Sequence, residues 1–229
     1  NIAQHLDKLN TLFAVALAEG IVKANPCQAV KRPRSAVKHS AKRLPFTGAQ
    51  IQAVFDAATA HGKDAEWIVR LLAYHGARSS EVCQLRCSDV TKVEGFDVLR
   101  IHDEAGSIKN AASLRDVPIH PKCAGIVAHA RAIAERHGPD AWLFQSLADH
   151  GQGRGHAFQN LFSRAIKPKV TADRRLTLHS LRHSTRDAFR RAKCDPEVSA
   201  AIMGHKLKGG EHFEYGAGVP MSERAEWIA

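Results

Sequence analysis

The sequence has few cysteines, and none of them stands in a paired arrangement. Its five cysteines form no CxxC spacing, which argues against a disulfide-stapled secreted domain and against a zinc site. Cys83 and Cys87 are four residues apart, and we expect them to pack in a core rather than to bind a metal. The composition gives no indication of a metal or a cofactor.

Long apolar runs are also missing, and acidic residues are outnumbered. No stretch approaches the roughly 18 apolar residues that a membrane-spanning helix needs, and no signal peptide is recognisable, so we expect a soluble, cytoplasmic protein. There are 33 Lys and Arg against 23 Asp and Glu, a net charge of +10 in 229 residues. This excess favours a polyanionic partner, nucleic acid before a membrane surface, although solubility alone accounts for part of it.

The first thirty residues carry an apolar stripe at helical spacing, which Gly20 ends. One helix cannot bury such a stripe alone. We therefore expect either the end of a helical domain or a helix packed on its neighbour. The stripe consists of Ile2, Leu6, Leu9, Phe13, Ala16 and Leu17.

A basic segment follows at residues 31–43. It contains six Lys or Arg, no acid and a proline, which predicts an extended linker. The segment is either a solvated tether or a series of phosphate contacts, and a second basic group lies between Arg164 and Arg175. The residues expected to contact DNA are Lys31, Arg32, Arg34, Lys38, Lys42, Arg43, Arg164, Lys167, Lys169, Arg174 and Arg175.

The next part of the chain predicts three helices and then a small sheet. Thr47 and Gln50 have capping-box spacing before the first helix, the second ends at Gly76, and the third runs from Ser79 or Ser80 to about Arg86. The pattern then changes to period two. Strands are expected at 89–95, 96–103 and 114–120, joined by turns at Glu94-Gly95 and around Gly106.

The remainder is predicted to be helical. "GQGRGH" at 151–156 has close glycines but follows no strand, so it predicts a loop and not a phosphate cradle. The whole pattern predicts an α+β fold, mainly α-helical, around a small three-stranded antiparallel sheet. The later helices are expected at 121–137, 156–167, 180–191 and 195–203.

Several polar residues stand where helices or strands end. Arg78 follows the stop at Gly76, and Lys109 lies between the second and third expected strands; taken alone, each is typical of a surface charge. His179 and Arg182 are three residues apart at a helix start, so both side chains can face one point.

The end of the chain adds two further candidates. His205 directly follows a helix-ending glycine, which places it on a loop. Of the two tyrosines, Tyr74 lies in an apolar helix and is expected to be packed there. Tyr215, in the glycine-flanked "EHFEYGAG", is therefore the candidate reactive phenol.

Three segments, "HGARSSEVCQLRCSDV", "LHSLRHST" and "IMGHKLKGGEHFEY", together resemble the three sequence boxes of the tyrosine recombinase or phage integrase family. The resemblance runs from about Thr47 to Tyr215. It implies the family's catalytic domain at 44–218, preceded by the C-terminal part of a helical core-binding domain at 1–30 and a basic interdomain linker at 31–43. A tail helix is implied at 219–229.

The resemblance also implies roles for individual residues. His183 is implied to be structural, and Glu81 to support the first catalytic arginine. The spacing of ten residues between His205 and Tyr215 is one residue longer than is usual in the family. The implied catalytic residues are Arg78, Lys109, His179, Arg182, His205 and, as the nucleophile, Tyr215.

The implied function is site-specific recombination of double-stranded DNA, without a metal, through a 3′-phosphotyrosine bond. Such an enzyme would integrate or excise a mobile element in a prokaryotic cell. A type IB topoisomerase-like activity, or a DNA-binding module that has lost catalysis, are the alternatives.

The resemblance further implies a tetramer on DNA, joined through the tail helix, with accessory DNA-bending proteins as possible partners. The alternative is a tail that packs on its own chain. Without DNA we expect the other five catalytic groups to converge on one basic pocket, while a mobile loop keeps Tyr215 away from both arginines.

Overall fold

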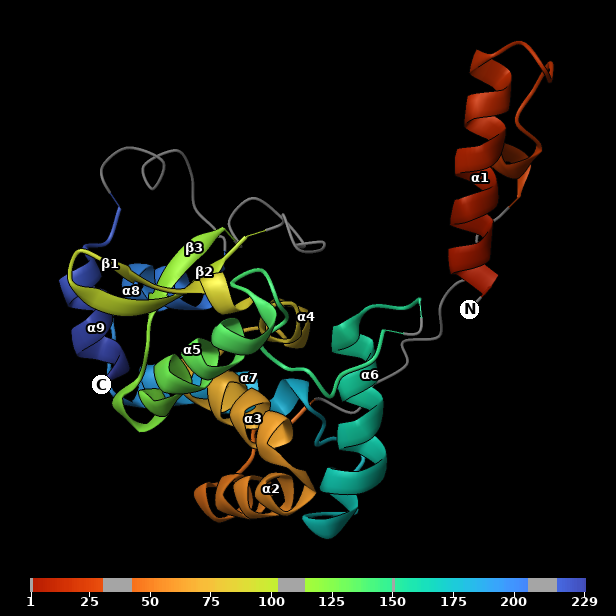
Figure 1. Cartoon of the computed structure of the whole chain (residues 1–229). Helices are drawn as coiled ribbons and strands as arrows, with labels where there is room; N and C mark the ends of the chain where they lie inside the picture. The colour runs from red at the N-terminus through yellow and green to blue at the C-terminus, as the bar shows by residue number, and fades with distance from the viewer. Residues whose placement is uncertain (1, 31–42, 103–113, 150, 206–217) are drawn as a thin grey trace. The chain divides into compact units, whose positions relative to one another are not determined.

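The computed structural model describes residues 2–30, 43–102, 114–149, 151–205 and 218–229. The chain divides into two compact units, 1–42 and 43–229, coloured along the chain in Figure 1. Within the described residues, no helix is both long and apolar enough to cross a membrane.

The first unit contains helix α1 (Ile2–Ala18) and the 3₁₀ turn η1 (Pro26–Ala29). Asn25 joins them, because its side chain accepts from the Cys27 amide and donates to the Asn10 carbonyl. The predicted helix is confirmed, and much of its apolar stripe, including Ile2, Leu9 and Leu17, is exposed. Its assignment to a core-binding domain stays a prediction.

The second unit begins with three helices, α2 (Gly48–His61), α3 (Lys63–His75) and α4 (Ser79–Cys83). The predicted capping box is present, with Thr47 and Gln50 each accepting from the other's backbone amide. Gly76 ends α3 in the left-handed conformation, at φ 60°. Helix α2 thus starts, and helix α3 ends, where strong local signals place them.

The predicted end of α4 at Arg86 is wrong. The helix ends at Cys83, and the chain enters the 3₁₀ turn η2 (Cys87–Asp89). Arg86 instead forms an isolated antiparallel bridge with Trp142. A long-range backbone pairing therefore replaces the last helical turn.

The sheet is the predicted antiparallel meander, in the order β1 (Val90–Val93), β2 (Phe96–Ile101), β3 (Arg115–Pro118). Leu99 lies opposite Val90 on one side and Val117 on the other. Glu94 and Gly95 both have positive φ, 51° and 85°, as a two-residue type I′ hairpin requires. The turn expected near Gly106 lies outside the described residues.

Helices then cover the sheet and complete the core. They are α5 (Gly125–His137) after the 3₁₀ turn η4 (Pro121–Cys123), α6 (Arg154–Leu161) continued by the π turn η5 (Phe162–Ile166) and the 3₁₀ turn η6 (Lys167–Lys169), α7 (His179–Arg191), α8 (Pro196–Met203) and α9 (Met221–Ile228). In Figure 1, α8 and α9 lie beside β3, and α3 lies against α7.

Helix α6 starts two residues earlier than predicted, so only the first half of "GQGRGH" is a loop. A Cβ on Gly155 would lie 2.8 Å from the Ser80 Cα, so the missing side chain lets α6 pack directly on α4. Arg154 adds a buried link, because its guanidinium donates to the carbonyls of Cys83, Phe144 and Leu147.

Cys83 and Cys87 are buried, as predicted. Burial raises the pKa of the Cys83 thiol far above its usual value. Among the described residues, no three His, Cys, Asp or Glu side chains are arranged to hold a metal ion.

Candidate functional site

Arg78 is placed by the sharp turn between α3 and α4. Its backbone amide donates to Glu81 Oε2 at 2.8 Å, and its Nη1 forms an ion pair with Glu81 Oε1. Its Nη2 donates to the carbonyl of Gly204 at 3.2 Å. The side chain is 20% exposed and that of Glu81 is 2% exposed. The buried Glu81 carboxylate therefore holds Arg78, whose side chain remains partly exposed.

Arg182 comes from the first turn of α7 and is only 4% exposed. Its Nη1 donates to the carbonyl of Gly76, next to the turn that carries Arg78. Its Nη2 is buried and has no hydrogen-bond partner among the described residues. Burial and then the charge of Arg78 lower the pKa of Arg182 to about 9, so it stays charged at neutral pH. A buried cationic donor without an acceptor is suited to an anion.

His179 lies one turn before Arg182, and its ring meets that of His183 edge-on, with centroids 4.9 Å apart. Partial desolvation, followed by the neighbouring His183 and the charges of Arg182 and Arg78, lowers the pKa of His179. The imidazole is therefore neutral at pH 7. The structural role implied for His183 stays a prediction.

His205 follows Gly204, which ends α8 in the left-handed conformation at φ 68°. Burial lowers the pKa of His205 to about 4, and the positive charges of Arg182, Arg186 and Arg78 act in the same direction. An anion among these groups would offset their repulsion and raise the pKa of both histidines.

Four of the six candidate catalytic residues therefore lie together, although they come from three separate parts of the chain. Two guanidiniums and two neutral imidazoles are brought together around one buried carboxylate, that of Glu81. The arrangement can bind an oxyanion and stabilise added negative charge on it. The other two candidates, Lys109 and Tyr215, lie outside the described residues, as does the expectation about the Tyr215 loop.

Only some of the residues expected to contact DNA belong to the part of the chain that the structure describes. Lys31, Arg32, Arg34, Lys38 and Lys42 lie outside the described residues. Arg43, Arg164, Lys169, Arg174 and Arg175 are exposed and Lys167 is half-buried.

One of these residues, Arg175, is ion-paired with Asp173 at 2.8 Å. The hydrogen bonds from Arg175 lower the pKa of Asp173 to about 2. Arg43 is close enough to α7 for its charge to lower the pKa of His179.

Sequence reasoning missed Arg115, at the start of β3. Its side chain is 4% exposed, and its Nη2 forms an ion pair with Glu81 at 3.0 Å. One signal was available, because a strand alternates its faces and Arg115 shares a face with the buried Val117. A charged residue on the core face of a strand needs a buried partner.

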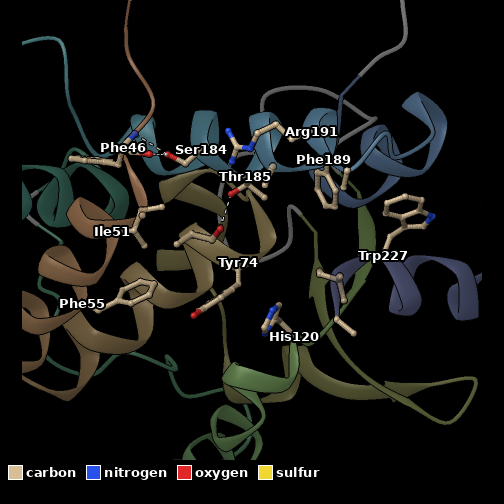
Figure 2. A pocket seen from close by; sticks show the side chains of 16 residues that line it. Phe46, Ile51, Phe55, Tyr74, His120, Ser184, Thr185, Phe189, Arg191 and Trp227 are labelled. Carbon is tan, nitrogen blue, oxygen red and sulfur yellow. Dashed lines mark hydrogen bonds between the residues drawn. The ribbon is translucent and has the colours of Figure 1, made fainter.

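A cavity of about 380 Å³ opens between α2, α3, α7 and α9 (Figure 2). Phe46, Phe55, Phe189 and Trp227 line it together with Tyr74. Tyr74 is packed as predicted, with its ring 5.6 Å from that of Phe55. This cavity is largely apolar and is not the site of the arginines.

Helix α9 borders this cavity and packs on its own chain. Met221 and Ile228 are buried, and Arg224 Nη1 donates to the Asp116 carbonyl of β3 at 3.1 Å. The tail therefore folds back in cis in this structure, and its docking on a second chain stays a prediction.

Comparisons with known proteins agree with the fold described above. The model of the phage integrase family matches residues 45–209. A tyrosine recombinase from Thermosipho africanus (strain TCF52B) is 24% identical over 212 residues, which are 89% of this chain and 67% of the relative.

Solved structures show the same fold. A lambda integrase tetramer bound to a Holliday junction superposes with a TM-score of 0.57 at 20% identity, over 92% of this chain and 60% of that one. The Tn1549 transposon integrase with circular intermediate DNA gives 0.56 at 19% identity, over 90% and 71%. This chain thus spans less than two thirds of the lambda integrase chain. With the family model matching most of its length, the chain belongs to the tyrosine recombinase, or phage integrase, family.

Proposed function

We propose that this chain is the catalytic part of a site-specific DNA recombinase that cleaves and rejoins DNA through a 3′-phosphotyrosine intermediate. One observation carries the proposal: Arg78 and Arg182 meet beside Glu81, and Arg182 keeps a buried Nη2 with no acceptor among the described residues. A phosphodiester oxygen is an acceptor of the required charge and size.

The chemistry follows from the charge that develops during attack. The Tyr215 oxygen attacks phosphorus, the phenol proton passes to a base, and the P–O5′ bond breaks as the 5′ oxygen takes a proton. We assign the general acid to Lys109 and the base, or a phosphate donor, to His179. The neutral state of His179 at pH 7 supports a proton acceptor. The two arginines stabilise the nonbridging oxygens of the transition state.

The setting of this reaction is part of the same proposal. Double-stranded DNA is the substrate, the basic residues of 31–43 and 164–175 contact its phosphates, and the natural role is integration or excision of a mobile element inside a prokaryotic cell. On DNA we propose a tetramer joined by the 219–229 tail, with accessory DNA-bending proteins as further partners. The net charge of +10 supports a polyanionic substrate.

Covalent trapping on a nicked suicide substrate tests the proposal. Bound DNA is first selected from a random pool, and a nick near the cleavage position lets the leaving fragment diffuse away. The protein should form a covalent adduct that survives a denaturing gel. The Tyr215→Phe variant should bind the same DNA and form no adduct, since it lacks only the attacking oxygen.

Tyr74→Phe is the matched control, because Tyr74 is packed beside Phe55 and takes no part in the proposed site. It should trap DNA like the unchanged protein. An adduct that persists in Tyr215→Phe would move the nucleophile elsewhere. Relaxation of supercoiled DNA without a specific site would favour the topoisomerase alternative, and specific binding without any adduct would favour a module that has lost catalysis.

A further inference from the structure

Arg115 is a deeply buried charge next to the site, and it is not among the residues assigned to catalysis. Its side chain is 4% exposed. Burying a guanidinium is costly unless its donors meet acceptors. Nη2 donates to Glu81 Oε2 at 3.0 Å, and Nε donates to the carbonyl of Ile202 at 2.8 Å. Arg115 thus joins two parts of the site that are far apart in the sequence.

The first of these parts is the carboxylate that orients Arg78. Glu81 Oε2 accepts from the Arg78 amide and from Arg115, while Oε1 pairs with the Arg78 guanidinium. Burial alone would raise the pKa of Glu81, but the charge and hydrogen bond of Arg115, together with the bonds from Arg78, hold it below its usual value. Arg115 therefore helps to keep Glu81 ionised, and Arg78 depends on that ionised carboxylate.

The second part is the turn that carries His205. Ile202 lies in the last turn of α8, and Arg78 Nη2 donates to the carbonyl of Gly204. A Cβ on Gly204 would lie 2.5 Å from Arg115 Nη1. The Arg115 guanidinium therefore packs directly against the backbone immediately before His205.

We propose that Arg115 is a positioning residue of the catalytic site. By holding Glu81 and the end of α8 together, it fixes the distance between the Arg78 guanidinium and His205 that the reaction requires. The inference rests on the proposed function. Arg115 itself is covered by these groups, so it acts through Arg78 and His205 and not by touching DNA. A purely structural ion pair would contribute stability and leave the reaction unchanged.

Arg115→Lys is the main test variant, because lysine keeps the charge but cannot make the two directed contacts of a guanidinium. At saturating DNA we expect single-turnover cleavage at least tenfold slower, with DNA affinity within about threefold of the unchanged protein. The acidic limb of the pH–rate profile should move to higher pH, because Glu81 is held ionised less strongly. Arg100→Met is the matched control, since Arg100 lies on β2 with a 48% exposed side chain paired to Asp116, and it should leave both readouts unchanged.

A second measurement keeps the test independent of catalysis. Binding of inorganic phosphate should raise the pKa of His205, followed by NMR of the imidazole, and Arg115→Lys should reduce that response at least threefold. If the unchanged protein forms no adduct, the proposed function fails, and this response alone decides the role of Arg115. Lower stability with an unchanged cleavage rate, pH profile and phosphate response would overturn the inference.

Discussion

His75 makes the stability of the second unit sensitive to acid. It is fully buried at the end of α3, where Nδ1 lies 3.1 Å from the Leu71 carbonyl and Nε2 accepts from the His120 amide at 3.1 Å. The carbonyl only accepts and the amide only donates, so both contacts require the same neutral tautomer. Protonation would place a charge in the core and a proton against the His120 amide.

The size of this stability loss follows from the shift in the pKa of His75. Burial lowers the pKa of His75 from 6.5 to about 3. As the pH falls below 6.5, the unfolded chain binds a proton that the folded chain does not, so stability is lost from pH 6.5 down to about pH 3. Each pH unit costs about 1.4 kcal/mol, hence ~3 kcal/mol between pH 6.5 and pH 4. His205, with a pKa of about 4, adds a loss of the same sign.

Urea unfolding of the full chain at several pH values measures this loss. All three tryptophans lie in the second unit, so their fluorescence reports that unit. His75→Gln retains an acceptor for the His120 amide and does not titrate, so its free energy of unfolding should fall by ~3 kcal/mol less between pH 6.5 and pH 4. His137→Gln, at an exposed histidine, is the control and should behave like the unchanged protein. Equal pH dependence in His75→Gln and the unchanged protein would refute the buried neutral imidazole.

Three other predictions concern the site, the packing and the charge. Arg182→Ala should slow single-turnover cleavage by about a hundredfold or more with little change in DNA affinity, and a rate within a few fold would make Arg182 dispensable. Gly155→Ala should lower the free energy of unfolding in urea by ~1–3 kcal/mol, because its Cβ would meet the Ser80 backbone. Gly48→Ala, with open space around it, is the control and should be neutral. Equal stabilities of the two variants would contradict the close packing of α6 on α4. The DNA association constant should fall steeply as salt rises, as counterions are released from phosphates, and a flat dependence would argue against DNA as the partner.

Most secondary structure could be predicted from local signals. The Thr47–Gln50 capping box, the Gly76 stop and the Glu94-Gly95 turn each depend on a few neighbouring residues, so they are readable without tertiary contacts. The two errors, at the end of α4 and at the start of α6, arose where distant parts of the chain meet. Helix α4 ends early where Arg86 pairs with Trp142.

Family motifs in the sequence singled out Arg78, Glu81, His179, Arg182 and His205. Each is a common residue type at a helix end or in a helix's first turn, so the motifs and not the local pattern identified them. Their charge states could not be obtained in the same way, because a pKa depends on desolvation and on charges brought in from elsewhere in the fold.

Only the tertiary structure decided which of these groups are paired. Arg115 and Glu81 are 34 residues apart, and Arg182 and the Gly76 carbonyl are 106 residues apart. Folding brings them into a region with little water, where an ion pair must be completed and an unpaired donor is costly. That is why Arg115 is buried as a partner of Glu81, while Arg182 keeps a buried donor with no acceptor among the described residues, as the proposed phosphate site requires.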